Sequence, residues 1–194
     1  MIKKYFFIDF FYYLKCFIYT KIFFQNSKLI RLPFDIRNKH LIKIGKNFTT
    51  GSFCRMEAYN EGNTRLTIGD NVQINDSVHI VANNSVTIED GVLIASKVFI
   101  SDCNHGSYGR NNVHTNPLIA PNDRELTINY VLIKSNVWIG ESVIILEGVT
   151  IGEGSIIGAM SLVNNNIPPY TIAVGIPAKI IKKFNFNNKK WEKV

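Results

Sequence analysis

A short polar run, Ser101–Gly106, carries the side chains with the greatest potential for chemistry in this chain. A neutral imidazole is the side chain best suited to remove a proton near pH 7, so His105 is a candidate general base. Cys103 could act as a nucleophile, but nothing in the sequence marks its thiol as activated. The cluster therefore indicates proton abstraction by His105 more than covalent catalysis by Cys103.

This cluster lies where a run of six-residue repeats is interrupted. The repeat is clearest from Ile133 to Ile167, where a large aliphatic residue recurs at every sixth position and a small or branched residue follows four places later. No α-helix has that period, and a short fixed repeat is typical of a parallel β-helix, in which each hexapeptide supplies one strand and one corner. We predict an all-β solenoid in which Ile145, Ile151 and Ile157 stack in a buried ladder.

The same repeat is present upstream, from Ile68 to Ile100, with a slip of two residues between Ile80 and Ile88. It stops at Ser101, and the polar, turn-rich residues that follow predict a long loop, residues 104–127. Long loops in compact domains are usually functional or disordered. Because this loop opens with the reactive cluster, we interpret it as functional.

The other histidines are weaker candidates for chemistry. His79 falls in a repeat corner and His40 precedes the repeats, so we interpret both as surface residues. His114 lies inside the loop, where it either shapes an acceptor site or is exposed without a role. A zinc site would need three imidazoles at matched positions, and the histidines show no constant relation to the repeat. We predict no metal.

The balance of 22 Lys and Arg against 15 Asp and Glu gives a net charge of +7, concentrated at the two ends. Such a charge suits phosphate-bearing small molecules or anionic lipid. Nothing resembles a nucleic-acid-binding module, so we predict no nucleic-acid partner. Cys16, Cys54 and Cys103 form no CxxC pair, which favours a reduced, cytoplasmic environment.

Residues 1–24 hold about half of the aromatic residues of the chain. Asp9, Lys15 and Lys21 argue against a membrane-spanning helix, and no small-residue cleavage site follows to mark a signal peptide. Two interpretations stay open. The segment is either a helix that caps the solenoid or packs on a neighbouring subunit, or an amphipathic segment that lies on the inner face of the cytoplasmic membrane.

Six segments together resemble the hexapeptide-repeat acetyltransferases, of the branch that O-acetylates bacterial surface polysaccharide. They are Asn71–Asp76, Leu93–Asp102, Asn104–Gly106, Val137–Glu141, Ile156–Ala159 and Val174–Lys179. The resemblance covers about residues 40–184, and the end of the chain is similar to lipopolysaccharide O-antigen O-acetyltransferases in particular. It implies a left-handed parallel β-helix, a homotrimer, acetyl-coenzyme A (acetyl-CoA) as donor, and active sites between subunits.

The resemblance also implies roles for single residues. His105 matches the catalytic base, and Asn104, Asp102 and Trp138 match the wall of the active site and acceptor site. The implied coenzyme-binding residues are Trp138, Gly140, Gly158, Ala159, Lys179 and Lys182. In the implied trimer, His105 of one chain faces Trp138 of another.

The expected organisation has three parts: an aromatic and basic segment, residues 1–40, a β-helix domain, residues 41–180, and a short basic tail, residues 181–194. The resemblance implies direct acetyl transfer, in a ternary complex, to a sugar hydroxyl of an O-antigen-type repeat unit or its lipid-linked precursor. Two alternatives stay open: an N-acyltransferase acting on an amino-sugar nucleotide, and a non-catalytic β-helix scaffold.

Overall fold

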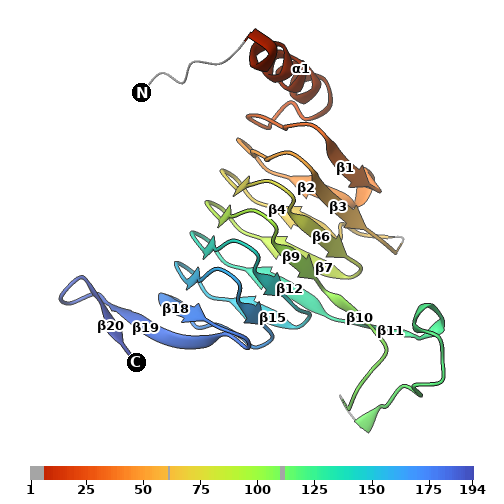
Figure 1. Ribbon diagram of the computed structural model, residues 1–194, viewed down its shortest axis with the longest axis vertical. Helices are drawn as coiled ribbons and strands as arrows, with labels where there is room; N and C mark the ends of the chain where they lie inside the picture. The colour runs from red at the N-terminus through yellow and green to blue at the C-terminus, as the bar shows by residue number, and fades with distance from the viewer. Residues whose placement is uncertain (1–6, 61, 110–111) are drawn as a thin grey trace.

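The computed structural model describes residues 7–60, 62–109 and 112–194, and shows a β-solenoid of about seven turns with one helix at its N-terminal end (Figure 1). The solenoid strands form three sheets, which we call sheets A, B and C. Within the solenoid the strands pair in parallel, as predicted for a β-helix. Between residues 66 and 163, consecutive solenoid strands fall on sheets C, A and B in turn, so three hexapeptides complete one coil.

The strands of each sheet lie far apart in the sequence. Sheet A contains β5 (Gln73–Ile74), β8 (Leu93–Ile94), β13 (Trp138–Ile139), β16 (Ile156–Ile157), β18 (Thr171–Val174), β19 (Lys179–Asn185) and β20 (Lys190–Lys193). Sheet B contains β1 (Phe34–Arg37), β3 (Cys54–Ala58), β6 (His79–Ala82), β9 (Phe99–Ser101), β14 (Ile144–Ile145) and β17 (Leu162–Val163). Sheet C contains β2 (Ile42–Ile44), β4 (Leu66–Ile68), β7 (Ser85–Ile88), β12 (Tyr130–Ile133) and β15 (Val149–Ile151).

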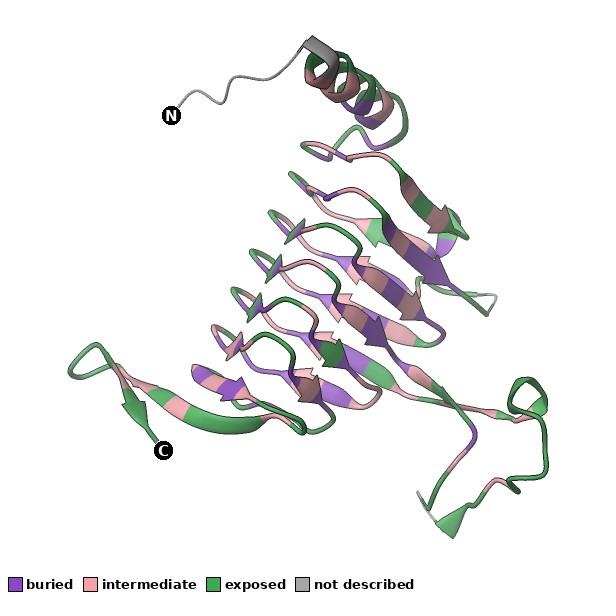
Figure 2. Cartoon of the chain, viewed as in Figure 1, coloured by how far each residue is buried: buried purple, intermediate pink, exposed green. Residues whose placement is uncertain are grey.

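The repeated aliphatic residues fill the interior of the solenoid, as Figure 2 shows by the alternation of buried and exposed positions. Their burial is confirmed, but the prediction that Ile145, Ile151 and Ile157 stack on one another is wrong. They belong to sheets B, C and A, and each stacks on the residue eighteen places away; Ile151 pairs with Ile133 and Ile157 with Ile139. The period of six therefore places residues inside the coil, and the period of eighteen sets their neighbours.

Helix α1 (Phe7–Phe23) lies across the N-terminal end of the solenoid (Figure 1). Cys16 and Thr20 are fully buried against the first coils, and the Thr20 hydroxyl accepts a hydrogen bond from the backbone N–H of Ile30 at 2.8 Å. The helix therefore caps the solenoid. The aromatic and basic segment expected from the sequence starts with residues 1–6, which lie outside the described residues. A 3-10 turn, η1 (Lys39–Leu41), lies at the end of this segment. Within the described ranges, no helix combines the length and apolar character needed to cross a bilayer.

The C-terminal residues are not a tail. Strand β19 pairs antiparallel with β18, and β20 folds back on β19, so the two strands extend sheet A as a hairpin. The ring of Phe184 lies 5.2 Å from that of Trp191 and stabilises the hairpin. The lysines of residues 181–194, which led to the prediction of a basic tail, lie on or next to this pair of strands.

The predicted loop leaves the corner between sheets B and C and has structure of its own. Its stem is an antiparallel pair, β10 (Cys103–His105) and β11 (Leu126–Ile128), and a 3-10 turn, η3 (Pro121–Asp123), lies near its return (Figure 1). We call residues 103–128 the excursion. It carries His105 away from the solenoid on a defined support.

Candidate active site

His105 lies at the end of β10, with its side chain exposed. Its Nδ1 atom lies 3.1 Å from the carbonyl oxygen of Pro121. A carbonyl can only accept a hydrogen bond, so in the neutral imidazole Nδ1 carries the proton and donates it to Pro121. The Nε2 atom then holds a free lone pair, which is the state that a general base needs.

Two residues of the excursion hold the backbone of His105 in place. The Tyr108 hydroxyl donates a hydrogen bond to the His105 carbonyl oxygen at 2.6 Å, and the Arg124 guanidinium donates to the Tyr108 hydroxyl at 2.8 Å. Arg124 also donates to the carbonyl oxygen of Ile119 at 2.9 Å. Sequence reasoning missed Tyr108 and Arg124, because neither belongs to the repeat or to a motif.

The side chain of Asp102 is fully buried. One carboxylate oxygen accepts the backbone N–H of Asn83 at 2.8 Å, and the other accepts those of Asn84 and Ser85 at 2.7 and 2.8 Å. The two-residue slip of the repeat supplies these three amides. Asp102 is therefore a positioning residue, which holds the corner from which the excursion leaves.

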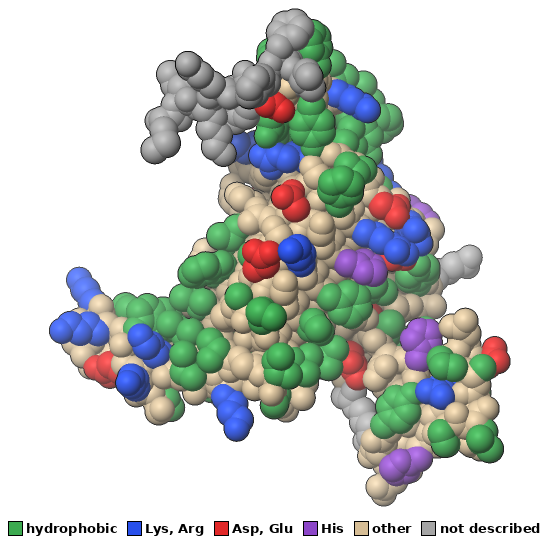
Figure 3. All heavy atoms as spheres, in the orientation of Figure 1, with side chains coloured by type: hydrophobic (Ala, Val, Ile, Leu, Met, Phe, Trp, Pro, Cys, Tyr) green, Lys and Arg blue, Asp and Glu red, His purple; other side chains and the backbone are tan. Residues whose placement is uncertain are grey.

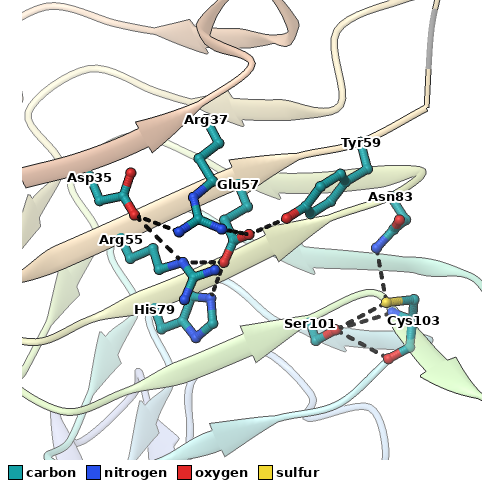
Figure 4. A network of polar contacts seen from close by, with 9 residues as sticks. All are labelled: Asp35, Arg37, Arg55, Glu57, Tyr59, His79, Asn83, Ser101 and Cys103. Carbon is teal, nitrogen blue, oxygen red and sulfur yellow. Dashed lines mark hydrogen bonds and ion pairs between the residues drawn. The ribbon is translucent and has the colours of Figure 1, made fainter. Parts of the chain in front are cut away.

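Cys103 is embedded in hydrogen bonds next to that corner (Figure 4). The side-chain amide of Asn83 donates to its sulfur at 2.9 Å, and the Ser101 hydroxyl lies 3.5 Å from the same sulfur. Burial raises the pKa of the Cys103 thiol, and the hydrogen bonds from Ser101 and Asn83 only partly oppose this rise. Because the thiolate is the reactive form, Cys103 is a weak nucleophile near neutral pH.

A second polar cluster lies on sheet B, in the coils that precede the excursion (Figure 4). Its centre is the buried carboxylate of Glu57, which accepts from His79 Nε2 at 2.8 Å and Arg37 Nη1 at 3.3 Å and also contacts Arg55 and Tyr59. Burial alone would raise the pKa of Glu57, but these hydrogen bonds and the Arg55 charge outweigh it, so the pKa lies below its usual value. His79 is thus part of a network rather than a bare surface residue.

Trp138 stands on the outer side of sheet A and is 50% exposed. The register of sheet A places it in one row of outward positions, which contains Gln73, Leu93, Trp138, Ile156, Ile172 and Lys182. Trp138 and Lys182 are therefore brought to one surface. His105 is not brought there, because its excursion leaves the corner between the two other sheets.

The two glycines of the implied coenzyme site occupy tight corners next to sheet A. A Cβ atom at Gly140 would lie 2.6 Å from the backbone nitrogen of Ala159, and one at Gly158 would lie 2.6 Å from a methyl carbon of Val174. Stacking of the coils therefore already requires both glycines. Ala159, which follows Gly158, is exposed, and so is Lys179, which pairs with Val174.

No group of three or more His, Cys, Asp or Glu side chains in the described part of the chain is arranged to hold a metal ion. Asn104 pairs with Thr127 in the stem of the excursion and is exposed next to His105.

Comparison with known proteins gives a consistent picture. The family model for bacterial transferase hexapeptide (six repeats) matches residues 130–165. WbbJ of Escherichia coli, which carries the provisional name lipopolysaccharide biosynthesis O-acetyl transferase, is 44% identical over 90% of this chain and 88% of its own. The dTDP-4-amino-4,6-dideoxy-D-glucose acyltransferase of Escherichia coli is 33% identical over 73% of this chain and 71% of its own.

Solved structures show the same architecture with coenzyme bound. A variant of the N-acyltransferase AntD from Bacillus cereus, in complex with dTDP-4-amino-4,6-dideoxyglucose and coenzyme A, matches with a TM-score of 0.70 and 28% identity over 84% of each chain. The hexapeptide-repeat acetyltransferase VCA0836 from Vibrio cholerae, in complex with acetyl coenzyme A, matches with a TM-score of 0.52 and 27% identity over 78% of this chain and 71% of its own.

Proposed function

Since the chain belongs to the hexapeptide-repeat acetyltransferases, we propose that it uses acetyl-CoA to acetylate a sugar hydroxyl of a bacterial surface polysaccharide. The proposed acceptor is an O-antigen-type repeat unit or its lipid-linked precursor. The 44% sequence identity to WbbJ, over 90% of this chain, supports this acceptor class. The observation that carries the chemistry is the hydrogen bond from His105 to Pro121, which leaves Nε2 free to accept a proton.

The proposed reaction is a direct transfer. His105 Nε2 takes the proton of the sugar hydroxyl while its oxygen attacks the thioester carbonyl. The carbon–sulfur bond then breaks, and the imidazolium returns the proton to the departing coenzyme thiolate. A positioned base supplies a rate factor of about 10²–10⁴, and holding donor and acceptor together in one complex can supply more.

The outward row on sheet A supports a donor site along this surface. Trp138 offers a half-exposed ring, and the ammonium groups of Lys179 and Lys182 could pair with the coenzyme phosphates. Because Trp138 and His105 lie on different sides of one solenoid, we propose that the site is completed between chains of a homotrimer. We expect the coil to be left-handed, as the resemblance implies, and the cap, solenoid and hairpin to act as one unit in the cytoplasm.

A second candidate is N-acylation of an amino-sugar nucleotide. It is favoured by the likeness to AntD, whose structure holds a dTDP-linked amino sugar, and by the 33% identity to an acyltransferase named for the same sugar. Donor, fold and base would be the same for both acceptors. The non-catalytic scaffold is disfavoured by membership of an enzyme family.

The test is acetyl-CoA turnover, followed by release of coenzyme thiol, with two acceptors in parallel. We expect turnover with O-antigen repeat units on their lipid carrier and none with a dTDP-linked amino sugar; the reverse result would establish the N-acyltransferase. His105→Ala should lower kcat by about 10²-fold or more, with acetyl-CoA binding kept. Cys103→Ala and His114→Ala are the controls. Loss of turnover in the Cys103→Ala variant, with turnover kept in the His105→Ala variant, would show that transfer is covalent.

A further inference from the structure

Helix α1 has an inward side and an outward side, and the outward side is largely apolar. The inward side packs on the first coils through Cys16 and Thr20. The outward side carries six large apolar side chains that are between 40% and 60% exposed: Phe10, Phe11, Leu14, Phe17, Ile18 and Ile22. Soluble single chains rarely expose so large a contiguous apolar patch, so this side is expected to contact something.

The charges on the outward side indicate what it contacts. At 100° per residue, Lys21 falls within the arc of the exposed apolar residues and Lys15 lies at its edge, about 20° beyond Ile22, while Asp9, the acidic residue of the helix, falls on the opposite side. The ammonium nitrogen of Lys21 lies 5.6 Å from the centre of the Phe17 ring. Figure 3 shows apolar side chains, in green, over the helix, with basic and acidic ones among them. We call this arc the outer α1 face.

We propose that the outer α1 face binds the interfacial region of a bilayer that contains anionic lipids. Aromatic and aliphatic side chains would enter the boundary between headgroups and acyl chains, and the two lysines would extend to lipid phosphates. Packing of the same face on a second copy of the chain would bring Lys15 and Lys21 near their counterparts without an acidic residue of the arc to pair with them. The charge pattern therefore favours lipid over a second copy.

Contacts with the first coils fix how the helix would lie. The Tyr12 hydroxyl donates to the carbonyl oxygen of Leu32 at 2.7 Å and lies 2.7 Å from the Ser52 hydroxyl, and Thr20 accepts from the Ile30 amide. These bonds hold the helix across the end of the solenoid (Figure 1). The helix would thus lie flat on the membrane surface. The two interpretations left open by the sequence then describe two sides of one helix.

The proposal does not depend on the identity of the acceptor, and it can be tested with the full chain and vesicles alone. We expect co-sedimentation with vesicles of phosphatidylcholine and phosphatidylglycerol at three to one, and at least tenfold weaker binding to pure phosphatidylcholine. Leu14→Ser/Ile18→Ser should lower binding to the anionic vesicles at least tenfold. Leu118→Ser, at a 90% exposed leucine in the excursion, is the matched control and should bind like wild type.

Lys15→Gln/Lys21→Gln should bring binding to the two kinds of vesicle close together, and added salt should act on wild type more than on this variant. Urea denaturation of each variant establishes that it is folded. The proposal is overturned if folded wild type does not sediment with the anionic vesicles. It is also overturned if Leu14→Ser/Ile18→Ser leaves vesicle binding unchanged but lowers the mass of the oligomer, because the occupant would then be a second copy.

Discussion

Replacement of Asp102 by alanine tests how the excursion that carries His105 is anchored. The buried carboxylate accepts three backbone N–H groups, those of Asn83, Asn84 and Ser85, at 2.7–2.8 Å. Alanine keeps the backbone and removes all three acceptors. The corner between sheets B and C should then loosen, and the stem of the excursion should move with it.

The size of the effect can be estimated from the number of bonds. A hydrogen bond to a charged group contributes about 1.5–3 kcal/mol, so three at the lower value give about 4–5 kcal/mol. Asn84 is exposed and Ser85 half-buried, so water can partly replace the carboxylate for these two amides. We therefore expect Asp102→Ala to lower the free energy of unfolding by about 3 kcal/mol.

The matched control is Asp76→Ala, because Asp76 is an exposed corner aspartate that accepts the backbone N–H of Ser52 at 2.7 Å. This single bond predicts a loss of about 1 kcal/mol. Urea denaturation followed by tryptophan fluorescence measures both losses. Turnover should fall in Asp102→Ala with little change in acetyl-CoA affinity, because the carboxylate touches only the corner. An Asp102→Ala protein as stable as Asp76→Ala would refute the reasoning.

Three further changes test the core, the polar cluster and the donor site. Ile151→Ala should lower the free energy of unfolding by about 2–5 kcal/mol and the neighbouring Thr150→Ala by about 0.5 kcal/mol or less, and equal losses would contradict the interior position of Ile151. Because its pKa is lowered from 4.5, Glu57 contributes stability above that pH that is lost as the pH falls through its folded value. The stability gap between wild type and Glu57→Gln should therefore shrink below pH 4.5, and a constant gap in chemical denaturation would exclude this coupling. Lys179→Ala/Lys182→Ala should raise the KM for acetyl-CoA and not that for the acceptor, with salt acting less on the variant than on wild type; equal salt sensitivity would count against the assignment.

The sequence was informative about the solenoid because its side chains alternate with a fixed period. Spacing alone identified Ile133, Ile151 and Ile157 as interior residues, and all are buried. Spacing did not identify their neighbours, since that requires knowing that three strands complete one coil. The hairpin β19–β20 was missed for a related reason, because its lysines and apolar residues follow no fixed period over a short stretch.

The candidate site was only partly accessible from the sequence. The position of His105 at the junction of repeat and loop was visible, but its partner Pro121 lies sixteen residues away. The supporting residues Tyr108 and Arg124 act through contacts that form only when the excursion folds. The sequence identified Asp102 as part of the polar run Ser101–Gly106. A polar run does not predict the burial of one of its side chains.

The excursion is closed where it begins. The backbone N–H of Asn129 donates to the carbonyl oxygen of Asp102 at 2.8 Å, and Cys103 pairs with Ile128, so the chain returns to the corner it left. Strands β7 and β12 on either side of the break pair directly, as though nothing had been inserted. The tip can therefore be lengthened, shortened or exchanged at a small entropic cost while the coil keeps its register. The coil register is thus set independently of the tip, whereas Tyr108, Pro121 and Arg124 tie the tip to His105, so an exchanged loop has to keep these three residues to keep the candidate base in place.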